Sequence, residues 1–218
     1  MDTVLYDVVK KIGLPVKAAA EVGVLSFQES ALKHFCEDGL SCDLYEAVPK
    51  FCEEIRQEIK DYPNVVLKDF AVSDYNGEME LCMVGASTFD AQLNHTPAID
   101  HDGYNKDKAE RVKVNCRDFS EIDEGHYDVV SIDIEGGEWK VLSRMVSRPM
   151  VISLETQCRD YINPNIGAIT DWMVENKYKV WVWNDTDTIF YKGSPPSLGI
   201  KNTILSKWHN FRYFSGRL

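Results

Sequence analysis

Residues 128–139 read Asp-Val-Val-Ser-Ile-Asp-Ile-Glu-Gly-Gly-Glu-Trp, a short apolar run followed by three carboxylates around a pair of glycines. The segment from Val129 to Ile134 has the continuous apolar pattern of a strand that is buried on both faces of a parallel sheet. The acids therefore follow the carboxyl end of this strand, and open α/β sheets bind their ligands at that edge. This pattern predicts an α/β domain with an acidic site at the end of its central strand.

Strands and helices alternate on both sides of this segment. The alternation predicts a doubly wound, mostly parallel, Rossmann-like sheet with a C-terminal antiparallel hairpin, whose connection is residues 184–187. Residues 85–110 are polar and irregular, and their length predicts a substrate loop or lid. We expect one domain over residues 1–192 and a basic aromatic extension over residues 193–218 that packs on it. The predicted strands are residues 16–22, 43–48, 64–72, 78–84, 111–116, 129–134, 150–155, 179–183 and 188–192, and the predicted helices are residues 4–12, 26–37, 49–60, 137–145 and 166–176.

Composition and charge exclude several classes of protein. The 218 residues include 35 acidic and 24 basic side chains, a net charge of −11, so the chain repels polyanions and we expect no nucleic-acid partner. No apolar run approaches the roughly 20 residues that span a bilayer, and the N-terminus lacks the pattern of a signal peptide. Six cysteines without zinc-site spacing indicate reduced thiols and a cytoplasmic location. Residues 192–218 differ in having five basic and no acidic side chains.

The acidic segment resembles the main motif of the FkbM-type methyltransferases, which reads roughly Asp-x-Glu-Gly-x-Glu after a hydrophobic strand. Those positions are Asp133, Glu135, Gly136 and Glu138 here. The resemblance covers about residues 18–157, and it implies a class I methyltransferase fold that uses S-adenosylmethionine. Relatives often methylate sugars or polyketide hydroxyls, so it also implies an O-methyltransferase acting on a hydroxyl of a sugar or glycan.

The first predicted strand ends at Glu21 and Gly23, which are similar to the first motif of class I methyltransferases. A dinucleotide site needs three glycines there to approach a pyrophosphate, and only Gly23 is present. S-adenosylmethionine has no phosphate, and its site needs one close backbone approach and an acid for its ammonium group. Glu46 ends the second strand, where a carboxylate can accept hydrogen bonds from both ribose hydroxyls. Taken alone, Glu46 could equally be a solvated strand-end acid, but its separation from Glu21 and Gly23 favours the binding role.

After the third predicted strand, residues 70–74 resemble the family's Ala-Val-Ser-Asp segment, which lines the adenine pocket. Together these motifs predict the residues that bind the donor. They are Glu21, Gly23, Ser26, Glu46, Ala47, Phe70, Ala71 and Asp133.

The candidate catalytic residues are Asp133, Glu155, Glu135 and His95. Methyl transfer to an alcohol requires alignment of the reacting atoms and a group that takes the hydroxyl proton. Asp133 and Glu155 end neighbouring strands, and Glu135 follows Asp133 by two residues, whereas His95 lies in the predicted loop. Glu138 falls in the first turn of the next helix, where an acid also favours the helix dipole. Oxygen-rich clusters suit Mg²⁺ or Ca²⁺, but the sequence assigns no metal ligand.

Two other functions and the assembly state remain open at this point. A scaffold that binds S-adenosylmethionine without turnover would keep the same fold. A nucleotide-dependent oxidoreductase would need a Tyr-x-x-x-Lys pair near the site, and the nearest such spacing, Tyr104 to Lys108, lies in the predicted loop. We expect a small-molecule or glycan acceptor as partner, and a homo-oligomer is compatible with the sequence.

Overall fold

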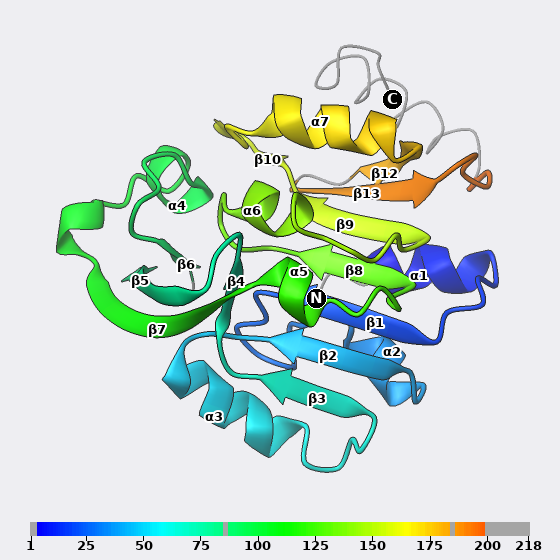
Figure 1. Cartoon of the computed structure of the whole chain (residues 1–218), viewed down its shortest axis with the longest axis horizontal. Helices are drawn as coiled ribbons and strands as arrows, with labels where there is room; N and C mark the ends of the chain where they lie inside the picture. Colours follow the sequence, from blue (N-terminus) through cyan, green and yellow to red (C-terminus); the bar gives the residue numbers. More distant parts are fainter. Residues whose placement is uncertain (1–3, 85–86, 184–185, 199–218) are drawn as a thin grey trace.

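The computed structural model describes residues 4–84, 87–183 and 186–198, and its largest sheet has seven strands (Figure 1). Five neighbouring strands of this sheet are parallel, and one strand runs antiparallel to both of its neighbours near the other edge. In spatial order the strands are β12 (Tyr178–Trp183), β13 (Asp187–Lys192), β9 (Val151–Glu155), β8 (Val129–Ile132), β1 (Ala18–Val22), β2 (Ser41–Tyr45) and β3 (Val65–Lys68). The predicted Rossmann-like sheet with its C-terminal antiparallel hairpin is confirmed.

Helices cover both faces of this main sheet (Figure 1). Every residue of β1, β8 and β9 is buried, as expected for parallel strands that are covered on two sides. One apolar cluster packs the sheet against α1 (Val4–Lys11), α2 (Lys33–Glu37) and α3 (Pro49–Glu58). The other packs it against α5 (Phe119–Ile122), α6 (Glu138–Leu142) and α7 (Ile166–Glu175). No described helix has the length and apolar character needed to cross a bilayer.

A second sheet of four strands lies beside the carboxyl ends of the parallel strands (Figure 1). Its strands, in spatial order, are β4 (Ala71–Ser73), β7 (Glu110–Asp118), β5 (Gly77–Val84) and β6 (Ser87–Asp90). The prediction of one strand over residues 64–72 was therefore wrong, because the chain leaves the main sheet after Lys68 and joins the second sheet at Ala71. A continuous apolar run does not reveal that its two halves pair with different neighbours.

In the described part of the predicted loop over residues 85–110, about half of the residues belong to short helices and strands. This part contains β6, α4 (Pro97–Asp100) and η1 (Lys106–Lys108), and β7 begins at its last residue. Thr96 caps α4, since its hydroxyl accepts a hydrogen bond from the Ile99 amide at 3.2 Å. The polar composition of this region reflects short elements at the surface and not a long irregular loop.

The helix predicted over residues 26–37 is reduced to α2, which begins only at Lys33. Glu21 explains this start, because its buried carboxylate accepts hydrogen bonds from the backbone amides of Ala31 and Leu32. These amides precede the first turn of α2 and have no partner within the helix. An acceptor on a neighbouring strand thus replaces the local capping residue that a sequence pattern would reveal.

All six cysteines are free, and only Cys158 is partly exposed, in the small antiparallel pair β10 (Gln157–Cys158) and β11 (Tyr161–Ile162). The start of the predicted extension packs on the domain: the Trp181 indole donates a hydrogen bond to the Pro196 carbonyl at 2.9 Å, and Leu198 packs against the cluster that holds α1. The rest of the extension, residues 199–218, lies outside the described residues.

Candidate active site

A cavity of about 260 Å³ opens at the carboxyl ends of β1, β2 and β8, between the main sheet and the second sheet. Gly23, Glu46 and Asp133 line it from the main sheet. Ala71 and Phe89 line it from the second sheet, so both sheets shape one chamber. This is the edge at which the acidic site was expected.

Gly23 is the point of closest backbone approach in this cavity. Its φ of +88° is left-handed, which favours glycine. A Cβ at this position would lie 2.9 Å from the carbonyl carbon of Asp133 and would overlap its oxygen. The Gly23 amide also donates to the Tyr45 carbonyl at 3.0 Å. Because Gly23 has no side chain, the ends of β1, β2 and β8 can approach one another this closely.

Glu21 lies beneath this turn and is only 5% exposed. Its carboxylate accepts hydrogen bonds from the Ser30 hydroxyl, from the Ala31 amide at 3.0 Å and from the Leu32 amide at 3.3 Å. Burial raises the pKa of Glu21 to about 7, although these hydrogen bonds favour the charged form. Glu21 lines the cavity, but donors within the protein already occupy most of the hydrogen-bond acceptor sites of its carboxylate.

Glu46 stands between β2 and α3. One of its oxygens accepts hydrogen bonds from the Ala47 amide at 2.8 Å and the Val48 amide at 2.7 Å, and the other accepts from the Leu25 amide at 3.1 Å. A carboxylate offers about four lone-pair sites, so one remains for a ligand. Ala47, Phe70 and Ala71 line the cavity nearby. Ser26, the remaining predicted donor residue, does not line it, and the Ser26 hydroxyl accepts from the Glu29 amide at 3.3 Å.

The turn between β8 and α6 is held by Glu138, which is fully buried. One oxygen of its carboxylate accepts hydrogen bonds from the amides of Ile134 and Gly136, both at 3.0 Å. The other accepts from the Asn163 amide nitrogen at 2.5 Å. Glu135 and Gly136 have φ values of +56° and +100°, so the turn needs this internal acceptor to keep its shape.

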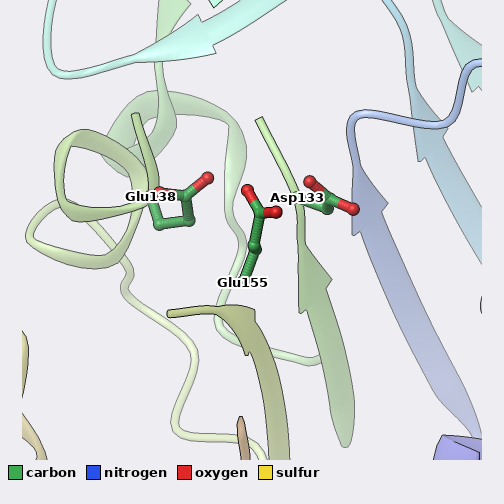
Figure 2. Close-up of side chains that lie close together, drawn as sticks. All are labelled: Asp133, Glu138 and Glu155. Carbon is green, nitrogen blue, oxygen red and sulfur yellow. The ribbon is translucent and has the colours of Figure 1, made fainter. Parts of the chain in front are cut away.

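Asp133, Glu138 and Glu155 point toward one another at the ends of β8 and β9 (Figure 2). One carboxylate oxygen from each lies within 4.8 Å of the other two. The exposed surface of Asp133 faces the cavity, while protein surrounds the rest of the side chain. Burial, and then the charges of neighbouring acids, raise the pKa of Asp133 and of Glu155. Both carboxyls are therefore more basic than ordinary surface acids.

The structure brings three of the four predicted catalytic residues together. Asp133 and Glu135 line the cavity, and Glu155 lies behind Asp133. Burial raises the pKa of Glu135, whose Oε2 is buried and has no hydrogen-bond partner in the described ranges. His95 does not line the cavity; its side chain is 69% exposed and its Nδ1 lies 3.3 Å from an Asp100 oxygen.

The second sheet contributes polar groups to the cavity that the sequence pattern did not reveal. Asp90 of β6 and Lys140 of α6 form an ion pair at 2.7 Å on the cavity wall. The hydroxyl of Thr88, also on this wall, is buried and has no hydrogen-bond partner among the residues described. No motif marks these residues, because β6 lies in the region that was interpreted as a loop.

Comparisons with known proteins agree with this architecture. The model of the methyltransferase FkbM domain matches residues 17–180. A putative caffeoyl-CoA O-methyltransferase from Staphylococcus aureus is 13% identical, with a TM-score of 0.50 over 88% of this chain and 85% of its own. Precorrin-6y C5,15-methyltransferase from Geobacter metallireducens is 15% identical, with a TM-score of 0.44 over 88% of each chain. No curated protein sequence matches the chain. Since the family model covers most of the main sheet and the whole cavity, the chain belongs to the FkbM family of S-adenosylmethionine-dependent methyltransferases.

Proposed function

We propose that this methyltransferase acts on a hydroxyl group, and that the acceptor is a sugar or a glycan. The observation that carries the proposal is the composition of the cavity, which runs from Glu46 and Ala71 to the acids Asp133 and Glu135. A hydroxyl must lose its proton during methylation, and carboxylates whose pKa is raised by burial are stronger bases than ordinary surface acids.

The donor would lie along the ends of β1 and β2. Glu46 keeps a free lone-pair site for the ribose hydroxyls, and Phe70 and Ala71 offer apolar surface for the adenine ring. Gly23 lets the methionine part approach the backbone. Glu21 supplies negative charge for the ammonium group, and it also holds the turn at Ala31 beside the cavity.

The reaction would then proceed as an in-line displacement at the methyl carbon. The acceptor oxygen forms a bond to carbon as the carbon–sulfur bond breaks, and the electron pair of that bond stays on sulfur. Asp133 orients the hydroxyl, and Glu135, whose Oε2 has no hydrogen-bond partner within the described part of the chain, accepts the proton. Lys140, Asp90 and Thr88 face the same space with polar groups suited to the other hydroxyls of a sugar ring.

Two measurements test this proposal. Isothermal titration with S-adenosylhomocysteine should show binding, and the absence of any binding at millimolar ligand would contradict donor use. Incubation with isotope-labelled S-adenosylmethionine and a panel of sugars, amines and thiols should label hydroxyl acceptors. Label transferred only to nitrogen or sulfur would disprove the hydroxyl assignment.

The Asp133→Asn variant adds a test of roles. It should lose turnover while it keeps affinity for S-adenosylhomocysteine, because the residue acts on the acceptor. Asp61→Asn, the same change at an exposed turn residue, is the control and should change neither quantity. An equal loss of turnover and of donor affinity would assign Asp133 to the donor instead.

A further inference from the structure

The carboxylates that meet beyond β8 and β9 lie beside the reacting end of the cavity (Figure 2). We propose that Asp133, Glu155 and Glu138 bind a hard divalent cation, and that this cation holds the acceptor hydroxyl as a further ligand. The second part rests on the proposed function, whereas cation binding itself does not.

The spacing of the three carboxylates fits such an ion. One oxygen of each residue lies within 4.8 Å of the other two. Oxygen ligands surround Ca²⁺ at about 2.3–2.6 Å, so two ligands on opposite sides of the ion are about 4.6–5.2 Å apart. An all-carboxylate set favours hard cations over zinc or copper.

Unpartnered buried groups give independent support. Glu155 is only 7% exposed, its Oε2 has no hydrogen-bond partner among the residues that the structure describes, and its side chain points between Asp133 and Glu138 (Figure 2). The hydroxyl of Tyr161, a residue 2% exposed, also has no partner among the described residues; burial raises its pKa, and the charges of Glu138 and Glu155 raise it further. A buried polar group without a partner is costly, and a hydrated cation would satisfy both oxygens.

The charge balance points the same way. Three carboxylates within 4.8 Å repel one another, and among the residues that the structure describes no lysine or arginine forms an ion pair with any of them. Lys140, a basic side chain on the cavity wall, is paired with Asp90 instead. A divalent cation would remove most of this repulsion without displacing any existing ion pair.

Access to the ion would come through Asp133, the one member of the cluster that lines the cavity. Glu138 would contribute the lone pair that remains on the oxygen bound by Asn163. A hydroxyl bound to the cation becomes more acidic, and its proton would pass to Glu135 as the oxygen attacks the methyl carbon. The electron pair of the broken carbon–sulfur bond leaves with S-adenosylhomocysteine.

Cation binding can be measured on the full chain without donor or acceptor. After treatment with EDTA, titration with Mn²⁺ followed by electron paramagnetic resonance, and with Ca²⁺ and Mg²⁺ followed by calorimetry, should show one site. Glu155→Gln should weaken binding on the order of 100-fold or more, and Tyr161→Phe by about 10-fold. Glu175→Gln is the matched control, because Glu175 is exposed and ends α7, away from the cavity. This variant should bind the cation with the affinity of the wild type.

Each result either supports or overturns the proposal. Wild-type protein that binds S-adenosylhomocysteine but no cation at millimolar concentration overturns the cation site and leaves the proposed function intact. Binding that survives Glu155→Gln overturns the ligand assignment. If Glu155→Gln does not fold, Asp133→Asn replaces it, since Asp133 is exposed to the cavity. Methyl transfer that is unchanged by EDTA overturns the role of the cation in holding the acceptor, even where the cation binds.

Discussion

Gly23 carries the most exacting steric demand among the residues of the cavity. Gly23→Ala should destabilise the protein by more than about 2 kcal/mol and abolish binding of S-adenosylhomocysteine, because the new Cβ overlaps the Asp133 carbonyl at a left-handed φ. Urea denaturation and calorimetric titration measure the two effects.

Gly39 provides the matched control for this variant. Its φ of +83° is close to that of Gly23, but a Cβ there would meet nothing within 4 Å. Gly39→Ala should therefore cost about 1 kcal/mol from backbone conformation alone and leave donor affinity unchanged. Equal effects of the two substitutions would show that the contact with Asp133 is not the cause.

Glu46 combines a local structural role with the proposed binding of ribose. Glu46→Ala should weaken S-adenosylhomocysteine binding by about 1–3 kcal/mol, because the ribose loses a charged acceptor. It should also lower stability, since three backbone amides lose their acceptor. Glu54→Ala, at an exposed position of α3, should do neither. Unchanged donor affinity in Glu46→Ala would remove Glu46 from the site.

The sequence predicts strand-end residues well and their partners poorly. Glu46 and Asp133 follow apolar runs, so their place at one sheet edge follows from the pattern. The meeting of Glu155 with Glu138 depends on the order of β8 and β9 and on the turn held by Glu138 itself. These are tertiary contacts, which periodicity does not encode.

At the scale of elements, the ion pair between Asp90 and Lys140 joins β6 to α6. Its Asp90 side chain is 7% exposed and its Lys140 side chain 25%, so water screens it only in part. A double-mutant cycle with Asp90→Asn and Lys140→Met should give a coupling free energy of about 1–2 kcal/mol. Unfolding by urea measures it.

The pair formed by Arg111 and Glu80 is the control within the same sheet. Both side chains are about 40% exposed, at 41% and 39%, and their coupling should stay below about 0.5 kcal/mol. If the coupling free energy of Asp90 and Lys140 is no larger than that of Arg111 and Glu80, the ion pair of Asp90 and Lys140 does not hold the second sheet against α6.

The elements themselves separate into predictable and unpredictable groups. The parallel core strands and α7 have strong apolar patterns, and the structure places them within a few residues of the predicted ranges. The strands β3 and β4 share one apolar run, and the start of α2 depends on Glu21, a residue about ten positions earlier. Their limits are set by pairing and by distant hydrogen bonds, so local patterns misplace them.

For the whole molecule, the buried carboxyls predict that stability falls as the pH rises through neutrality. Glu21 has a folded pKa of about 7 against an ordinary value of 4.5, so the folded state holds its proton more tightly. The contribution of Glu21 to the free energy of unfolding is complete when the pH is below its ordinary pKa of 4.5, and it is lost as the pH rises through about 7. Thermal unfolding between pH 5 and pH 8, in a buffer without divalent cations, should show this decline, and Glu21→Gln should make it shallower. An identical slope in the variant would exclude Glu21 as a cause.

Asp118 should affect the stability of the protein on the acid side of its pH profile. Hydrogen bonds from Arg144 lower the pKa of Asp118 to about 2 from its ordinary value of 3.8. The stability it contributes is therefore present above its ordinary value and is lost as the pH falls through about 2. Asp118→Asn should flatten the acid side of the profile and leave the alkaline side unchanged.

Because five of the six cysteines are buried, Cys158 is the one native thiol that a fluorescent label could reach in the folded protein. A thiol-reactive fluorophore applied to the native protein should couple to Cys158 alone, whereas the urea-unfolded chain should take up six equivalents. Cys158 lies on β10, three residues beyond Glu155 in the chain. The fluorescence of a label on Cys158 would therefore change when a ligand binds at the carboxylate cluster. Ligand exchange could thus be followed in real time on the wild-type sequence, without introducing a single foreign residue.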